Sequence, residues 1–298
     1  MITTRTAKQC GQADFGWLQA RYTFSFGHYF DPKLLGYASL RVLNQEVLAP
    51  GASFQPRTYP KVDILNLILE GEAEYRDSEG NHVQAKAGEA LLISTQPGIS
   101  YSEHNLSKDK TLTRMQLWLD ACPERENPLV QKIDLKGDQQ QLIASPDGSK
   151  GSLQLRQQVW LHHIELKKGE QASFQLHGPR AYLQSIHGTV HAVTHTEEKE
   201  ALTCGDGAFI RDEANITLVA DTPLRALFDK HRVWQNRRAL TTEAINRLSH
   251  EQLRQAVQLL MRAELTLKQD YGQSVWAELE SLSLLLCHKA LADVFIDG

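Results

Sequence analysis

Four residues with charged or phenolic side chains lie in two closely spaced pairs in the first part of the chain. They are Arg57, Tyr59, Tyr101 and Glu103. A guanidinium and a carboxylate attract each other and phenols form hydrogen bonds, so together they could bind a small polar molecule. They suit a transition metal poorly, because a guanidinium has no lone pair to offer and a phenol is mostly protonated at neutral pH. Two interpretations stay open: an internal Arg57–Glu103 ion pair that fills space, or a ligand pocket.

Glycines precede both pairs at a characteristic spacing. Gly51 opens the first motif, and Gly98 and Asn105 bound the second. This spacing resembles that of the cupins, small β-barrels that normally hold one metal ion. The resemblance implies histidines at three of the four polar positions, and only Glu103 keeps the expected residue type. The replaced positions are Arg57, Tyr59 and Tyr101.

Longer segments make the resemblance more specific. Residues 22–32 read YTFSFGHYFDP, residues 36–44 read GYASLRVLN, and residues 145–152 read SPDGSKGS. Over roughly residues 1–227 the chain resembles the pirin family, whose members are bicupins. Some bacterial pirins are quercetin 2,3-dioxygenases that hold a metal in the N-terminal cupin through three histidines and a glutamate. The replaced ligands therefore imply no cofactor, and a divalent metal such as iron would bind only if the site were rescued.

The distribution of turn-forming residues separates two kinds of structure. All ten prolines and all but two of the nineteen glycines lie before residue 229. Apolar residues alternate with period two in several earlier stretches, which predicts short strands separated by turns. We expect an all-β bicupin with barrels at 1–125 and 126–228, followed by a small α-helical appendage at 229–298. The alternating stretches include 37–43, 64–69, 72–75 and 115–119.

The C-terminal part resembles a different family. Residues 222–238, 252–260 and 265–298 are similar to the end of the delta subunit of the bacterial DNA polymerase III clamp loader. In that subunit the region belongs to a helical collar that contacts neighbouring subunits. The resemblance implies a fusion with its junction within 222–229, and clamp-loader subunits as possible partners. A capping box at 249–252 and apolar residues at helical spacing predict helices here.

The cysteines and histidines give weaker evidence for redox or metal chemistry. The cysteines lie far apart, which fits free thiols in a reducing cytoplasm. Cys10 and Cys122 lie in irregular segments and are candidate redox thiols, and we expect one or the other to react before the remaining two cysteines; the alternative is that all four are inert. Six histidines between residues 162 and 195 have no spacing that forms an obvious metal site. The other two cysteines are Cys204 and Cys287.

The bulk properties limit the classes of function. A net charge of -4 gives no reason to expect direct DNA binding. The opening residues are polar and no apolar run approaches the roughly 20 residues that span a bilayer, so we expect a cytoplasmic protein with no membrane partner. Our main hypothesis is a metal-free bicupin that binds an unidentified small molecule in its N-terminal cupin or responds to redox conditions. The alternatives are a metal-dependent quercetin 2,3-dioxygenase and a DNA replication protein acting through the tail.

Overall fold

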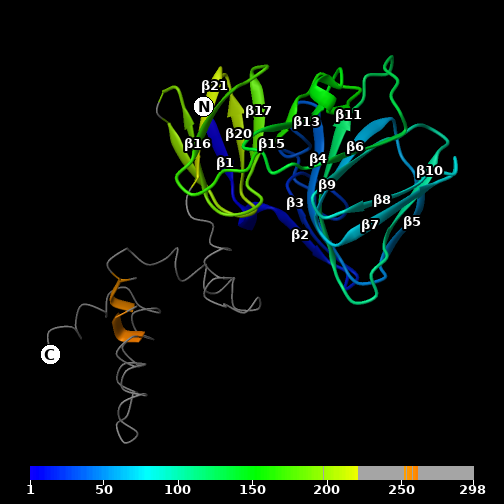
Figure 1. Ribbon diagram of the computed structural model, residues 1–298, viewed down its shortest axis with the longest axis horizontal. Coiled ribbons are helices and arrows are strands. Elements are labelled where there is room, and N and C mark those ends of the chain that lie inside the picture. Colours follow the sequence, from blue (N-terminus) through cyan, green and yellow to red (C-terminus); the bar gives the residue numbers. More distant parts are fainter. Residues whose placement is uncertain (197, 221–251, 253, 257, 261–298) are drawn as a thin grey trace, which may run out of the picture. The chain divides into compact units, whose positions relative to one another are not determined.

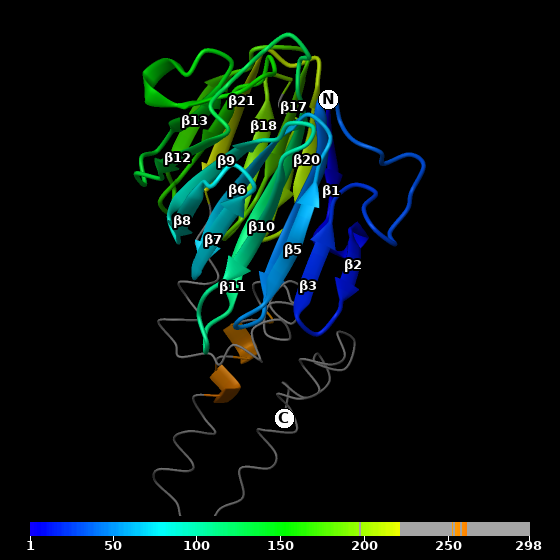
Figure 2. The ribbon, with the colours of Figure 1, turned by 90° about the vertical axis from the view of Figure 1, so that its right-hand side faces the viewer.

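The computed structural model describes residues 1–196, 198–220, 252, 254–256 and 258–260. The chain divides into two compact units, Met1–Pro223 and Leu224–Gly298. The first unit consists of two barrels of short, mostly antiparallel strands, shown in two views in Figures 1 and 2. It also holds two short 3-10 helices, η1 (Ala7–Gln9) and η2 (Ser149–Gly151).

The N-terminal barrel is made of a seven-stranded and a four-stranded sheet. The first has the order β12-β9-β6-β11-β4-β3-β2 and the second β5-β10-β7-β8. Their inner faces share one hydrophobic core, which includes Ile64 of the larger sheet and Tyr75 of the smaller. The strands are β2 (Gly11–Asp14), β3 (Leu18–Tyr22), β4 (Leu40–Leu48), β5 (Ser53–Thr58), β6 (Val62–Glu70), β7 (Glu72–Asp77), β8 (His82–Lys86), β9 (Glu89–Ser94), β10 (Ser100–Asn105), β11 (Leu112–Asp120) and β12 (Val130–Asp134).

Three smaller sheets form the C-terminal barrel. Their orders are β1-β20-β17, β16-β21-β18-β19 and β14-β13-β15. A core that includes Phe174 and Leu218 fills this barrel. The strands are β1 (Ile2–Arg5), β13 (Gln141–Ser145), β14 (Leu153–Gln154), β15 (Leu161–His163), β16 (Gln171–Gln175), β17 (Arg180–Gln184), β18 (Val190–Thr194), β19 (Lys199–Leu202), β20 (Gly207–Arg211) and β21 (Asn215–Ala220).

The two barrels exchange strands across the expected boundary at residue 125. β1, at the start of the chain, pairs antiparallel with β20, and Figure 1 shows this blue strand among those of the C-terminal barrel. β12 lies beyond the boundary in sequence but pairs with β9 of the N-terminal barrel. The domain boundaries at residues 125 and 228 remain predictions. One strand from each side of residue 125 is hydrogen-bonded into a sheet of the other barrel.

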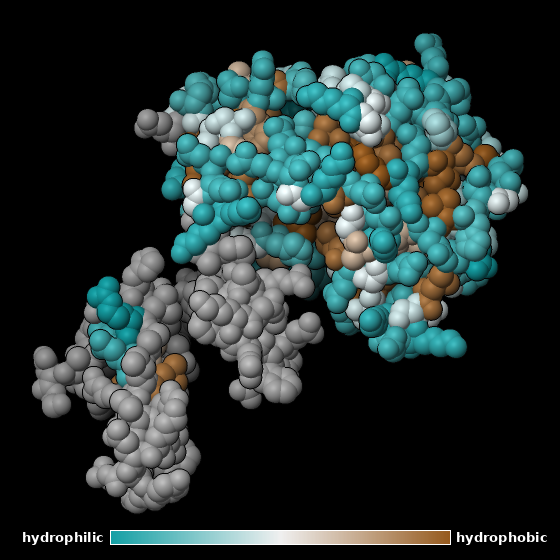
Figure 3. Space-filling model, in the orientation of Figure 1, coloured by the Kyte–Doolittle hydropathy of each residue, from teal (hydrophilic) through white to brown (hydrophobic). Residues whose placement is uncertain are grey.

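A third hydrophobic core joins the barrels. It contains Leu65 and Leu117 from the seven-stranded sheet together with Ile143 and Leu155 from the C-terminal barrel. The central strands of the seven-stranded sheet are therefore covered on both faces, and every residue of β6 from Val62 to Ile68 is buried. On the face seen in Figure 3, hydrophobic side chains form separate patches among hydrophilic ones.

The described part of the second unit is helical at residues 252, 254–256 and 258–260. Ala256 is buried and Leu260 is half exposed. An all-β bicupin with a small helical C-terminal region is thus confirmed. The predicted fusion junction lies outside the described residues, as do residues 249–251 of the predicted capping box and most of the apolar residues expected at helical spacing. Among the residues described, none belongs to a helix long and apolar enough to span a bilayer.

Candidate functional site in the N-terminal barrel

Two neighbouring strands of the four-stranded sheet bring the expected site residues together. Arg57 lies in β5, and Tyr101 and Glu103 lie in β10. These strands pair antiparallel, with Tyr101 opposite Arg57. Tyr59 follows β5 directly, and its ring stacks on Tyr101 with centroids 4.5 Å apart and planes at 20°. The positions that sequence reasoning grouped are therefore close in space.

The phenols form a packed aromatic cluster. The Tyr101 ring also contacts Tyr75 at 5.2 Å, and Tyr59 meets the edge of Trp118 at 5.5 Å. Burial, and secondly the charge of Glu103, raise the pKa of Tyr59 and place the pKa of Tyr101 well above its ordinary value. Both phenols are therefore protonated at neutral pH and can form hydrogen bonds.

Glu103 does not pair with Arg57, which corrects the ion pair considered from the sequence. Its Oε1 atom lies 2.6 Å from Nη1 of Arg114, whose Nη2 lies 2.9 Å from Oε2 of Glu46. All three side chains are buried, whereas Arg57 is exposed. Burial opposes the charge of Arg114, but the carboxylates of Glu103 and Glu46 outweigh it and raise the pKa of the guanidinium. A permanent internal cation therefore bridges the two carboxylates.

Amide side chains extend this bridge across the seven-stranded sheet. Asn66 Nδ2 donates to Oε1 of Glu103 at 3.3 Å, and Gln116 Nε2 donates to Oδ1 of Asn66 at 2.9 Å. Trp118 Nε1 donates to Oε1 of Gln116 at 2.9 Å. The Arg114 guanidinium also lies over the Phe54 ring, 5.0 Å from its centroid. Hydrogen bonds and ion pairs of this kind offset the cost of burying polar groups.

Sequence reasoning missed Arg114, Glu46 and Asn66. A signal was present: Arg114 and Glu46 are oppositely charged residues within the stretches that became β11 and β4. They lie directly opposite each other in the ladder. Opposite charges facing each other across two strands are a recognisable stabilising pair, but the sequence does not say which strands are neighbours.

The residues present do not fit the metal that cupins usually hold. Two phenols and an exposed guanidinium stand at the positions implied for histidines, and Arg114 occupies the carboxylate of Glu103. Across the described ranges, no group of three or more His, Cys, Asp or Glu side chains could hold a metal ion. His104, next to Glu103, bonds instead to Ser102 Oγ through Nε2 at 2.9 Å.

The thiols differ from expectation in their exposure. Cys10 is buried, Cys122 is half-buried and Cys204 is exposed. The order of exposure is therefore the reverse of what an early reaction of Cys10 would need, and the order of reaction itself stays a prediction. η1 folds Cys10 back so that its Sγ donates to the Thr6 carbonyl at 3.6 Å, whereas Cys204 lies in the turn before β20. Cys287 lies outside the described residues.

The double barrel and its motif spacing define the chain as a bicupin. Comparison with known proteins narrows the class: residues 3–119 match the family model "Pirin", and residues 142–229 match "Quercetinase C-terminal cupin domain". The chain is 87% identical to the pirin-like protein YhaK of Escherichia coli K12 over 227 residues, which are 76% of this chain and 97% of that protein. The chain therefore belongs to the pirin family.

Other matches include a protein that is named as an enzyme and a pirin whose structure was solved with a metal. A quercetin 2,3-dioxygenase of E. coli K12 is 35% identical over 232 residues, 76% of this chain and 97% of that protein. The crystal structure of E. coli YhaK covers 73% of this chain and 96% of its own at a TM-score of 0.62 and 86% identity. The structure of the E. coli pirin YhhW in complex with nickel(II) covers 75% and 95%, with a TM-score of 0.69 and 34% identity.

The C-terminal region matches a separate family. Residues 215–293 fit the model "Processivity clamp loader gamma complex DNA pol III C-term". The similarity to the DNA polymerase III subunit delta of E. coli K12 is 85% identity over 79 residues. These residues are 26% of this chain and 23% of the subunit, so the chain spans about a quarter of the length of that relative.

Proposed function

We propose that this chain is a metal-independent pirin that binds a small anionic molecule beside Arg57 on its N-terminal barrel. The observation that carries the proposal is the bridge from Arg114 to Glu103 and Glu46. It engages the carboxylate that a metal would need and supplies the positive charge from the protein itself. Outside this bridge, Arg57 is exposed, and its charge acts on the Tyr59 phenol. A guanidinium beside a phenol suits a carboxylate or phosphate ligand.

Metal content and oxygen chemistry test the first half of the proposal. Purified protein, supplied with iron, nickel, copper and zinc during growth, should carry well under one ion per chain by mass spectrometry. It should also show no oxygen-dependent cleavage of quercetin, with the related quercetin 2,3-dioxygenase as the positive control. Stoichiometric metal that disappears in a Glu103→Gln variant would overturn metal independence, and oxygen-dependent quercetin cleavage lost in the same variant would support the dioxygenase alternative.

Anion binding tests the second half. Benzoate and inorganic phosphate should shift the NMR signals of Arg57 and Tyr59. Arg57→Gln should weaken anion binding at least about tenfold, the effect expected for loss of a charged partner. Arg41→Gln is a matched control, because Arg41 is another exposed arginine and its Nη2 is paired with Asp120 at 2.7 Å. Equal binding by the wild type and both variants would exclude Arg57 as the anion site.

A second candidate function is association with clamp-loader subunits through the C-terminal region. The 85% identity to the delta subunit over 79 residues favours it. Gel filtration of the chain with purified clamp-loader subunits should give a complex that is lost when residues 224–298 are deleted. Absence of a complex with every subunit would remove this candidate.

A further inference from the structure

A cleft of about 510 Å³ opens on the first unit, and none of its lining residues belongs to the Arg114 bridge. One wall is the segment 125–127, which follows β11. A second is the loop at 146–147, and a third is formed by Gln154, Gln158 and Trp160. The volume lies within the range of sites that enclose small molecules.

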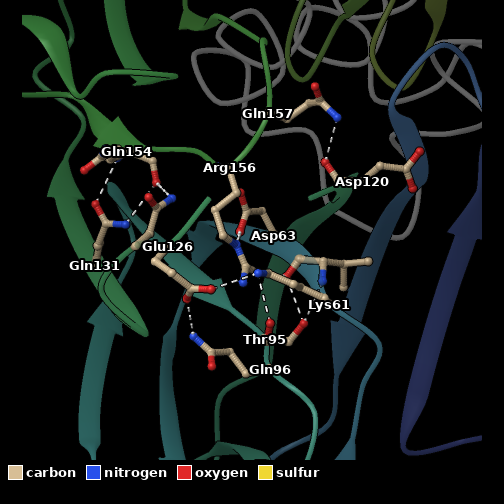
Figure 4. Close-up of polar contacts among 12 residues, drawn as sticks. Lys61, Asp63, Thr95, Gln96, Asp120, Glu126, Gln131, Gln154, Arg156 and Gln157 are labelled. Atoms are coloured by element: carbon tan, nitrogen blue, oxygen red, sulfur yellow. Dashed lines mark hydrogen bonds and ion pairs between the residues drawn. The ribbon is translucent and has the colours of Figure 1, made fainter. Parts of the chain in front are cut away.

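Hydrogen bonds hold the walls of this cleft in place. Asn127 Nδ2 donates to the Gln154 carbonyl at 2.7 Å. Gln131 Nε2 donates to the same carbonyl at 3.1 Å, and Gln131 Oε1 accepts from the Gln154 amide at 2.9 Å (Figure 4). These bonds use the Gln154 backbone. In the part of the chain that the structure describes, no hydrogen bond engages the side-chain amides of Gln154 or Gln158, so both can serve a ligand.

The charges of the lining nearly cancel. Glu126 lies 3.0 Å from Lys61 Nζ and accepts a bond from Gln96 at 3.0 Å, as Figure 4 shows. Lys61 lowers the pKa of Glu126, so this carboxylate stays ionised and its charge is offset. Arg125 and Asp147 then contribute one charge of each sign. A charged ligand would find no excess of opposite charge here, which favours a neutral one.

An aromatic ring completes the site. The Trp160 indole stacks on the His177 ring with centroids 4.3 Å apart and planes at 13°, which fixes its orientation. A tryptophan offers a flat apolar surface, and primary amides both donate and accept hydrogen bonds. This combination fits a ring compound with an apolar face and hydroxyl groups around its edge. We propose that the cleft binds a neutral sugar of one or two rings.

Saturation-transfer NMR and titration of the full chain with D-glucose, D-ribose and maltose test this site. At least one sugar should bind with a dissociation constant of about 1–10 mM, and Trp160→Ala should weaken binding at least about tenfold. Gln158→Ala should weaken binding of the same sugar by roughly threefold or more, which is the effect expected for one lost hydrogen bond. Trp17→Ala is the control: it removes an exposed tryptophan of the N-terminal barrel and should leave sugar binding unchanged.

Three results would overturn the proposal: no binding of any sugar at about 50 mM, unchanged binding in Trp160→Ala, or binding at Trp160 of benzoate or phosphate in preference to sugars. If Trp160→Ala does not fold, the Gln154→Ala/Gln158→Ala double variant takes its place and should abolish binding. The metal analysis and the Arg57→Gln titration concern the other site, so their outcomes are independent of this one.

Discussion

At the scale of single residues, the proposed metal independence of the N-terminal barrel rests on Arg114. Its guanidinium is fully buried and contacts two carboxylates, and it cannot lose its proton in a protein. A metal ion can dissociate, whereas this cation is covalently part of β11. The loss of histidines removes ligands, but Arg114 adds a second obstacle because a metal would have to displace it from Glu103.

This leads to a prediction about restoring a metal site. Replacing Arg57, Tyr59 and Tyr101 with histidine should give weak nickel binding, because Arg114 still holds Glu103. Adding Arg114→Leu and Glu46→Gln together frees Glu103 without leaving another buried charge unpaired, and should strengthen binding at least about tenfold. Nickel titration calorimetry measures both. The Arg114→Leu/Glu46→Gln variant alone is the control, and tight nickel binding by the three-histidine variant would contradict the obstacle assigned to Arg114.

The cysteines give a second prediction at this scale. Alkylation by limiting iodoacetamide at pH 7 should modify Cys204 before Cys122, and Cys10 last, since exposure falls in that order. Peptide mapping by mass spectrometry gives the order in which the cysteines are alkylated. Modification of Cys10 first would mean that the segment around η1 opens readily. The redox-responsive function itself stays a prediction, to be tested by repeating the mapping with peroxide.

At the scale of elements, the sequence predicted strands better than it predicted their partners. The alternating stretches at 64–69, 72–75 and 115–119 lie within β6, β7 and β11, and the glycine-bounded motifs became β5 and β10. Alternation shows which side chains share a face, but not which sheet that face covers. The pairing of β1 with β20 and the bridge through Arg114 both depend on contacts between strands distant in sequence, and these were not predicted.

The β7–β8 hairpin gives a prediction about pH. Burial alone would raise the pKa of Asp77, but hydrogen bonds from Asn81, Tyr75 and Glu79 lower it. The carboxylate therefore stabilises the fold above the pKa of about 3.9 that it has when unfolded, and this stabilisation is lost as pH falls through the lower folded value. Asp77→Asn should reduce the free energy of unfolding by about 1–2 kcal/mol at pH 7.

Urea denaturation at pH 7, 5 and 3 measures this effect. The difference in the free energy of unfolding between wild type and Asp77→Asn should persist at pH 5 and become smaller at pH 3. Glu79→Gln is the matched control, because Glu79 contributes only its backbone amide to Asp77, at 3.0 Å. A difference that is constant across the three pH values would show that ionisation of Asp77 does not contribute.

At the scale of the whole molecule, a buried ion pair connects the N-terminal barrel to the chain entering the C-terminal one. Arg156 Nε lies 2.8 Å from Oδ1 of Asp63, and both side chains are fully buried. Arg156 Nη2 also donates to the carbonyls of Val62 at 2.8 Å and Thr95 at 3.0 Å (Figure 4). These bonds fix β6 and β9 to the segment that follows β14.

Removing one partner of this pair should strongly reduce the free energy of unfolding. Asp63→Ala leaves the Arg156 charge buried without its carboxylate, so we expect a loss of about 3–5 kcal/mol in the free energy of unfolding. Chemical denaturation measures it. Asp120→Ala breaks the partly exposed Arg41–Asp120 pair instead and should cost less than about 1 kcal/mol. Similar losses in both variants would mean that the buried pair is not an important connection between the barrels.

The last prediction concerns the dependence of the barrels on the C-terminal region. Residues 221–251 lie outside the described ranges, so deletion is a clearer test of this dependence than proteolysis. Among the residues that the structure describes, those that form the three hydrophobic cores lie no later than Leu218, and the first compact unit ends at Pro223. A chain ending at Pro223 should therefore keep the midpoint of thermal unfolding within roughly 2–4 °C of the full chain, equivalent to about 1 kcal/mol. It should also give the same metal content and the same result in the anion titration as the full chain. If this deletion unfolds the barrels, the C-terminal region is an integral part of the bicupin, and the description of the chain as two joined, independent parts is wrong.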